Sequence, residues 1–259
     1  MIVDVSACVG EYPFRFLDAR REPAWLLTQM DRLAIDRAWV GHLPSILYKD
    51  PAAGTAELLR AVQPHADRLV PVPTIHPGLP GWEDDLNVAS LAGAPAIRVY
   101  PMQQGLDPAG SAMRVIVAAA GAIDMPVMLT VRMEDLRQRH PLDAATDMPA
   151  SAIRALARSD VQARLIVLNA DRPMLEEVHF GLTDEEARRV LWDIGWLWGP
   201  PEDHLRLLIE TVGIGRFTFG TGMPLRIPDG AFAKVDLLDL TDADRAAITG
   251  GNLSRWRAG

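Results

Sequence analysis

The sequence predicts an α/β protein, a single (β/α)8 TIM barrel formed by residues 1–259. Short segments rich in apolar and β-branched residues alternate along the chain with segments of helical spacing, as in a parallel sheet wrapped by helices. Most of the apolar segments are apolar throughout, which is typical of strands buried on both faces. Within the 259 residues there is no low-complexity linker, charge block or abrupt change of composition, so we expect one domain.

Eight segments are predicted to be strands, and a closed barrel accommodates them best. A doubly wound open sheet is the alternative, but no Gly-x-Gly-x-x-Gly follows the first strand. The predicted strands are residues 2–5, 37–41, 69–75, 96–100, 127–131, 164–168, 190–194 and 217–220.

Several helix boundaries are also marked in the sequence. Thr183 followed by Glu186 predicts a capping box at the start of a helix. Pro149 indicates another helix start, since proline is favoured in the first turn. A further helix is expected from Pro201 to Gly213, where glycine suits the left-handed position after a helix.

The composition excludes several classes of function. The formal net charge is −8, which argues against a nucleic-acid partner, because phosphates require a concentrated basic face. The longest apolar stretch, residues 115–123, is too short to span a bilayer, so we expect no membrane partner. The first residues lack the pattern of a secretory signal, and the single cysteine, Cys8, excludes an internal disulfide framework. These features indicate a cytoplasmic location.

Five motifs are spread over nearly the whole chain. They are Ile-Val-Asp-Val-Ser-Ala-Cys at 2–8, Pro-Val-Met-Leu-Thr at 126–130, the strand at 164–170, Phe-Gly-Thr-Gly-Met-Pro at 219–224, and Gly-Gly-Asn-Leu at 250–253 before Arg255. They resemble the first, fifth, sixth and eighth strands and the closing helix of the amidohydrolase superfamily, family 2 type. The resemblance implies a TIM-barrel hydrolase with its active site at the carboxyl ends of the strands.

The family's metal ligands are replaced at every corresponding position, and Asp4 alone survives from these motifs. A zinc or manganese centre needs about three or four histidine or carboxylate ligands. We therefore expect no metal and no cofactor; the resemblance includes members that hydrolyse lactones without metal. The replacements are Ser6 and Cys8 for two histidines, Thr130 for the fifth-strand histidine, Asn169 or Ala170 for the sixth-strand histidine, and Gly222 for the aspartate.

Polar residues at the expected strand ends provide candidate site residues. Arginine binds carboxylate and phosphate in a two-pronged fashion, so the arginines there predict a small anionic partner; the alternative is that each pairs with a neighbouring carboxylate. Proton transfer or nucleophilic attack is assigned to Asp193, His76, His140 and Cys8. Substrate binding is assigned to Arg98, Tyr100, Arg132, Glu134, Arg172, Trp196 and Arg226.

Two segments are unusual enough to carry a role. Residues 132–147 form a long charged connection, which is either a binding element or a solvated surface loop. Trp192, Trp196 and Trp198 fall within seven residues. They line a pocket, pack in the core, or form the interface of a homo-oligomer, since aromatic residues are enriched at interfaces.

Three functions follow from these observations. The first is a metal-independent hydrolase acting on a small carboxylate or lactone. The second is a catalytically inactive barrel that serves as a small-molecule-binding or subunit-contact protein; a mouth plugged by Met223 and Trp196 would favour it. The third is a metal-dependent hydrolase with ligands recruited from His42, His76, His140, His179 or His204.

Overall fold

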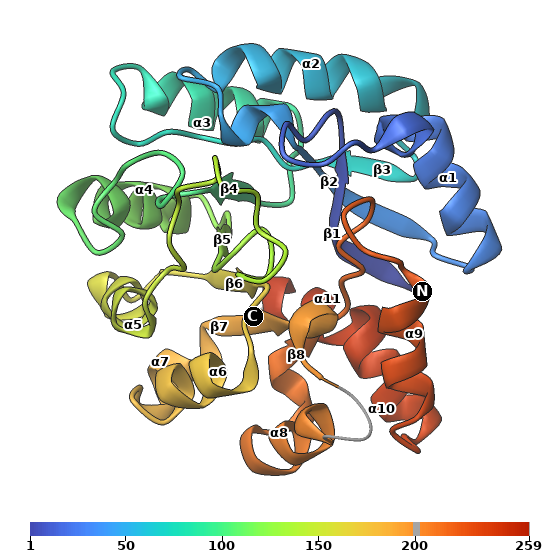
Figure 1. The fold of residues 1–259 in the computed structure, drawn as a ribbon. Helices are drawn as coiled ribbons and strands as arrows, with labels where there is room; N and C mark the ends of the chain where they lie inside the picture. The colour runs from blue at the N-terminus through green and yellow to red at the C-terminus, as the bar shows by residue number, and fades with distance from the viewer. Residues whose placement is uncertain (199–202, 259) are drawn as a thin grey trace.

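Eight parallel strands form in the order that the sequence predicts, and helices surround them as a ring (Figure 1). The structure is a computed structural model that describes residues 1–198 and 203–258. The hydrogen-bonded order is β1-β2-β3 and β4-β5-β6-β7-β8. The strands are β1 Val3–Val9, β2 Arg37–His42, β3 Leu69–Pro71, β4 Ile97–Val99, β5 Val127–Thr130, β6 Leu165–Leu168, β7 Val190–Asp193 and β8 Phe217–Thr218.

Main-chain hydrogen bonds close the two gaps between these groups of strands. Between β3 and β4, the amide of Arg98 donates to Pro73 O (2.8 Å) and the amide of Ile75 donates to Arg98 O (3.0 Å). Between β8 and β1, the amide of Val5 donates to Phe219 O (3.0 Å). The sheet is therefore closed on itself, and the predicted TIM barrel is confirmed.

All eight strands differ from the predicted bounds by at least one residue at an end, and β1, β3 and β8 illustrate the physical reasons. The segment predicted at 69–75 is a strand only to Pro71, because Pro71 and Pro73 have no amide hydrogen to donate to a ladder. β8 is shorter than predicted, and the chain after it turns into a loop that packs against β1. β1 is longer than predicted, since Ser6 and Cys8 are buried as strand residues rather than exposed in a loop.

The helices lie outside the sheet, and α11 packs against the apolar cluster inside the barrel. The capping box of Thr183 and Glu186 is confirmed, and Gly213 follows a helix with φ of 88°. The predicted start at Pro201 lies outside the described residues. The helices are α1 Pro23–Arg32, α2 Ala52–Val62, α3 Trp82–Leu91, α4 Ser111–Ala122, α5 Ala150–Ser159, α6 Arg172–His179, α7 Asp184–Arg188, α8 His204–Val212, α9 Asp229–Asp236, α10 Asp242–Ala246 and α11 Asn252–Ala258, with short turns η1 Asp18–Arg21, η2 Pro44–Ile46, η3 Gln63–His65, η4 Ile194–Trp196, η5 Ile214–Arg216 and η6 Ala247–Gly251.

Apolar side chains fill the barrel interior. Met128, Ile166 and Leu191 come from three successive strands and pack in one buried cluster. Leu253 of α11 belongs to the same cluster, with Trp256 packed against it. The strands therefore enclose a packed core rather than a channel. Space for a ligand is left at the carboxyl ends of the strands. None of the described helices is long and apolar enough to cross a membrane.

Candidate functional site

A buried arginine occupies the barrel at the carboxyl ends of the strands. Arg98 of β4 is 3% exposed, and its Nη1 donates hydrogen bonds to Cys8 Sγ (3.3 Å) and Tyr100 Oη (3.2 Å). Gly41 of β2 leaves room for it, because a Cβ at that position would lie 2.7 Å from Nη1. A guanidinium stays protonated in proteins, so a fixed positive charge is held inside this end of the barrel.

The cavity beside Arg98, which we call the axial cavity, has a volume of only about 20 Å³. That is room for about one water molecule. Its wall includes the positions at which the family motifs would place metal ligands. The residues that line it are Ser6, Cys8, Arg98, Thr130, Met133, Leu168, Asn169, Gly222, Leu225 and Arg226.

This donor set does not fit zinc or manganese. Serine and threonine hydroxyls, an amide and one thiol do not supply the histidine and carboxylate ligands that such ions take. In the part of the chain that the structure describes, no three His, Cys, Asp or Glu side chains form a group able to hold a metal. The guanidinium of Arg98 would also repel a divalent cation at short range.

Two buried carboxyl groups lie next to each other near the β8–α9 connection. Asp4 Oδ1 accepts hydrogen bonds from the amides of Ser6 and Thr221 (both 3.0 Å), and its Oδ2 accepts one from Thr221 Oγ1 (2.5 Å). Asp193 Oδ1 accepts one from the amide of Gly195 (2.8 Å), whereas Oδ2 has no partner among the described residues. The pKa of Asp193 is raised to about 6, mainly by burial, and the charge of Asp4 acts in the same direction.

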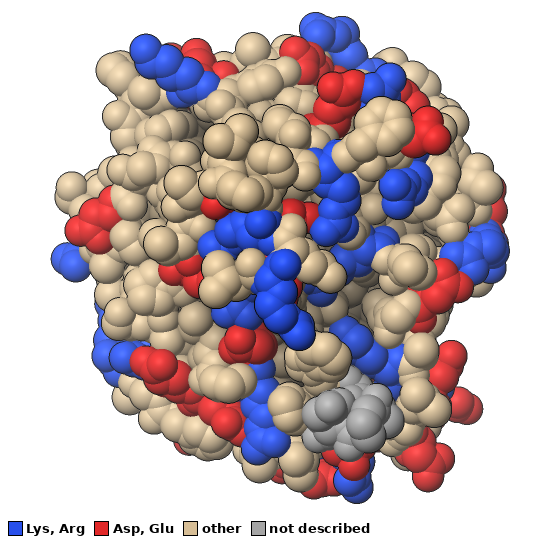
Figure 2. Space-filling model, viewed as in Figure 1, with Lys and Arg blue, Asp and Glu red and all other residues tan. Residues whose placement is uncertain are grey.

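A much larger cavity opens to one side of the axial cavity, and we call it the mouth cavity. Its volume is about 460 Å³, and it shares Met133, Leu225 and Arg226 with the axial cavity. Figure 2 shows basic side chains gathered over the middle of this face of the molecule. The remaining lining residues are Arg15, Glu134, Asp135, Arg137, Gln138, Gly195, Trp196, Leu197, Trp198, Gly230, Ala233, Lys234 and Leu237.

Two cations in the mouth cavity converge on one carbonyl group. Arg226 Nη1 donates to Gly195 O (2.9 Å), and Lys234 Nζ donates to Gly195 O (2.7 Å) and Ile194 O (3.2 Å). Arg226 also stacks on Trp196, with its Cζ 3.6 Å from the ring centre. Burial lowers the pKa of Arg226 to about 10 and that of Lys234 to about 8, although the carboxyl group of Asp193 acts in the opposite direction on both.

Glu134 is the buried carboxyl group of the mouth cavity. It is 4% exposed and forms an ion pair with Arg15, which reaches it from the segment after β1. Burial raises the pKa of Glu134, and the charge of Arg15 partly offsets this. A carboxylate with a raised pKa beside a cavity is suited to accept a proton near neutral pH.

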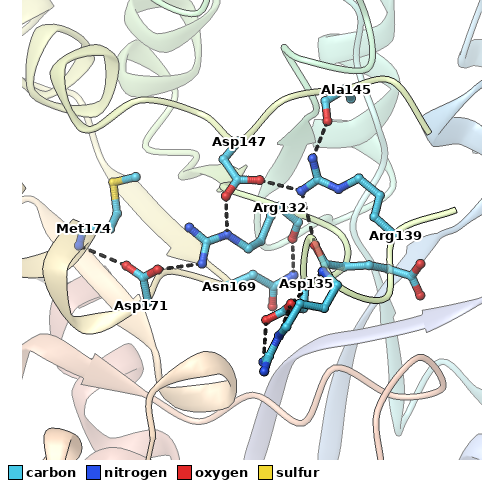
Figure 3. Close-up of polar contacts among 10 residues, drawn as sticks. Arg132, Asp135, Arg139, Ala145, Asp147, Asn169, Asp171 and Met174 are labelled. Carbon is cyan, nitrogen blue, oxygen red and sulfur yellow. Dashed lines mark hydrogen bonds and ion pairs between the residues drawn. The ribbon is translucent and has the colours of Figure 1, made fainter. Parts of the chain in front are cut away.

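The connection after β5 is held in place by ion pairs (Figure 3). Arg132 contacts Asp147 and Asp171, each at 2.7 Å, and Arg139 contacts Asp147 at 2.5 Å. Residues 133–138 of this connection supply one wall of the mouth cavity. The segment therefore lines the cavity at one end while salt bridges anchor the rest.

The structure brings only some of the predicted site residues together. Trp196, Arg226 and Glu134 line the mouth cavity. Arg98 and Cys8 line the axial cavity, and Arg98 donates hydrogen bonds to Cys8 and to the buried Tyr100. Asp193 lies behind Gly195 and lines neither cavity. Arg132 is paired as described above, although its Cζ is 5.5 Å from the Trp196 ring centre, and Arg172 is paired with Glu176 at 2.7 Å outside both cavities.

The predicted proton donors and nucleophile are not assembled around a common point. His76 accepts a hydrogen bond from the amide of Gly78, and His140 is exposed and stacks on Phe14. Neither lines the mouth cavity or the axial cavity. Burial raises the pKa of Cys8 in spite of the nearby Arg98, so the thiol stays protonated at neutral pH. Among the described residues its sulfur contacts Arg98 Nη1 and Ser6 O and is hydrogen-bonded to no side-chain base.

Two charged residues that line the mouth cavity, Arg15 and Lys234, were not predicted from the sequence. Arg15 follows β1 on the mouth side, so its position after a strand was a usable signal. Lys234 lies within α9, and its side chain reaches back to η4. Nothing in the local sequence indicates that contact, because it depends on how α9 packs.

Comparison with known proteins shows the fold but no close relative. No family model and no curated protein matches the chain. A 2,6-dihydroxybenzoate decarboxylase in complex with 2,6-dihydroxybenzoate has a TM-score of 0.76 at 15% identity, covering 99% of this chain and 98% of that chain. An amidohydrolase from Burkholderia multivorans with bound zinc has a TM-score of 0.71 at 16% identity, covering 100% and 99%.

A third similar structure is described as a "probable 2-pyrone-4,6-dicarboxylic acid hydrolase" from Acinetobacter baumannii with citric acid bound. Its TM-score is 0.69 at 12% identity, and the match covers 100% of this chain and 99% of that chain. Identities this low show a shared fold. The barrel fold expected from the motifs is therefore confirmed for this chain.

We predict that Asp193→Asn removes a pH-dependent part of the stability. Burial raises the pKa of Asp193 from 3.8 to about 6, so folding favours its protonated form. This contribution is fully present below the unfolded pKa and is lost as the pH rises through about 6. A shift of this size corresponds to roughly 3 kcal/mol.

Urea unfolding at a series of pH values between about 4 and 7 measures this effect. The free energy of unfolding of the wild type, minus that of Asp193→Asn, should fall as the pH rises. Asp67→Asn, at an exposed carboxylate, is the control. A difference that is flat or grows with pH would contradict the assignment.

Proposed function

We propose that the chain is a metal-independent hydrolase that acts on a small carboxylate, in particular a carboxylated lactone, bound in the mouth cavity. The observation that carries the proposal is the unmatched positive charge of this cavity. Arg226 and Lys234 donate hydrogen bonds only to main-chain carbonyl groups, and neither has an ion-pair partner within 4.0 Å among the described residues. A carboxylate on the substrate would supply the missing charge.

The surroundings of these cations favour an organic anion over a bare inorganic one. Trp196 and Trp198 supply apolar ring surface to the cavity wall, and Leu197, Leu225 and Leu237 add to it. A cavity of 460 Å³ lies in the size range of small-molecule sites. An unsaturated or aromatic ring that carries a carboxylate matches both features.

Glu134 is positioned to act as the general base. In the proposed step it takes a proton from a water molecule, the water oxygen attacks the ester carbonyl carbon, and the ring C–O bond breaks. The leaving oxygen recovers a proton from Glu134, so that the group ends in its starting state. Arg15, which is ion-paired with Glu134, stabilises negative charge on the carbonyl oxygen during the attack.

The structural neighbours support the class of substrate. One is named for 2,6-dihydroxybenzoate, and another is named as a hydrolase of 2-pyrone-4,6-dicarboxylic acid. Both compounds are ring carboxylates, and the second is a lactone. The likeness in fold makes these two compounds the first probes for this chain.

The inactive-barrel alternative depends on a plugged mouth, and the mouth cavity is open. Met223 is fully buried in a core cluster with residues of β1, β2, α1 and α2, and Trp196 forms a wall of the cavity rather than a plug. The relocated-metal alternative depends on clustered histidines. Among the described residues, no three His, Cys, Asp or Glu side chains form a group able to hold a metal. His42 contacts Ser45 and Glu57, and His140 stacks on Phe14.

We expect Arg226→Gln to weaken binding of 2-pyrone-4,6-dicarboxylate by about 10- to 100-fold, because a charge-assisted contact contributes about 1.5–3 kcal/mol. Isothermal titration of the wild type and the variant measures the change. Arg172→Gln is the matched control, since Arg172 is half-buried and lies outside both cavities. Equal losses in the two variants, or no loss in either, would overturn the assignment of the cavity.

We expect Glu134→Gln to abolish hydrolysis while leaving binding of the lactone within a few-fold of the wild type. The amide keeps the size of the side chain but cannot accept the proton. In the wild type, kcat should rise with pH through a pKa above the ordinary value for glutamate, because burial raises the pKa of Glu134. Unchanged kcat in the variant, measured by loss of the lactone's absorbance, would exclude Glu134 as the base.

A further inference from the structure

Lysine is scarce in this chain, and one of the two lysines lies in the mouth cavity. Lys and Arg total 26 residues, and all but Lys49 and Lys234 are arginine. The two side chains are not equivalent in chemistry. A guanidinium stays charged, whereas an amine can lose its proton and then act as a nucleophile.

The two lysines differ in their surroundings. Lys49 is exposed, in the turn between η2 and α2. Lys234 is half-buried on α9 and lines the mouth cavity. Lys49 therefore provides an internal reference for the reactivity of an ordinary surface amine.

Hydrogen bonding orients the amine of Lys234. Its Nζ donates to Gly195 O at 2.7 Å and to Ile194 O at 3.2 Å. A neutral amine has two hydrogens and one lone pair, so these two bonds use both hydrogens. The lone pair then points away from the two carbonyl oxygens, and because the residue lines the cavity, it is the part of the group that a ligand can meet.

The charges around Lys234 favour loss of its proton. Arg226 donates to the same carbonyl oxygen, which places a second positive charge beside the amine. The pKa of Lys234 is lowered to about 8, mainly by burial; Asp193 of β7 opposes the change and Arg226 contributes to it. An amine next to another cation in a desolvated pocket is a known way to activate a lysine nucleophile. The other charged groups of the cavity are Arg15, Glu134, Asp135 and Arg137.

We propose that Lys234 forms an imine with small aldehyde- or oxo-carboxylates bound in the mouth cavity. The lone pair of Nζ attacks the carbonyl carbon, and the oxygen takes up a proton to give a carbinolamine. The hydroxyl group then leaves as water while nitrogen loses a proton and the C=N bond forms. The net change is amine plus carbonyl to imine plus one water, with no oxidation or reduction.

This inference rests on the carboxylate binding proposed above, and it connects with the proposed hydrolysis. Opening of an enol lactone releases an enol, which tautomerises to an oxo group. The product is then an oxo-carboxylate, the class of compound that Lys234 would capture in the same cavity. A protonated imine withdraws electrons from the adjacent carbon, so it would favour loss of a proton or a carboxyl group there.

The test is trapping of the imine with borohydride in the intact protein. The wild type is incubated with limiting 4-formylbenzoate, reduced, and analysed by intact mass and peptide mapping. Benzaldehyde is the uncharged control, and Lys234→Arg and Lys49→Arg are the matched variants. We expect reduced adduct on Lys234 in at least 10-fold excess over Lys49, lost in Lys234→Arg and retained in Lys49→Arg. Labelling of Lys234 should rise with pH through about 8.

The outcomes separate this inference from the proposed function. Equal labelling of the two lysines, or labelling of Lys49 alone, would overturn the imine while binding of 2-pyrone-4,6-dicarboxylate could still hold. Labelling of Lys234 by benzaldehyde as readily as by 4-formylbenzoate would overturn carboxylate binding and the substrate class inferred here. The decisive comparison is made within the wild-type chain, so it does not depend on the folding of a variant.

Discussion

The buried charge of Arg98 is the constraint on which the arrangement of this barrel mouth depends. A cation with 3% exposure must be compensated, and its Nη1 is held by the thiol of Cys8 and the phenol of Tyr100. The guanidinium also favours the ionised form of Asp4 across the barrel. These partners and the absence of a side chain at Gly41 fix one position for the group.

Two consequences follow from a guanidinium in that position. The axial cavity shrinks to about 20 Å³, so a substrate cannot enter the barrel along its axis. The larger space instead lies beside it, between the β5 connection, η4 and α9. The positive charge at this end of the barrel is carried by side chains, Arg98 beside the axial cavity and Arg226 and Lys234 in the mouth cavity.

The mouth cavity brings three kinds of side chain together. Arg226 and Lys234 provide charge without ion-pair partners among the described residues, Trp196 orients Arg226 by stacking, and Glu134 supplies a carboxyl group of raised pKa. Arg15 connects this carboxyl group to the segment after β1. The site therefore draws on both ends of the chain, which a closed barrel brings together.

The sequence was sufficient for the fold but only partly for the site. Buried parallel strands are apolar throughout, so their order could be predicted. The strand shortened most, β3, is followed by Pro73 and ends at Pro71. Trp196, Arg226 and Glu134 were found because they follow strands.

The remaining site residues depend on packing between distant segments. Arg132 was expected to bind substrate, yet Asp147 and Asp171 reach it from two other segments. Lys234 was missed because α9 lies far in sequence from the carbonyl of Gly195 that it contacts. Neither contact can be predicted from neighbouring residues in the sequence, because each depends on how distant segments pack.

Metal content tests the central claim most directly, namely that side-chain cations have taken over the role of a metal in this barrel. The untagged protein would be purified after growth with added zinc and manganese, analysed for both elements, and unfolded with and without a chelator. The account predicts metal far below one equivalent per chain and the same free energy of unfolding in both conditions. About one equivalent of metal per chain, lost together with stability on chelation, would contradict it.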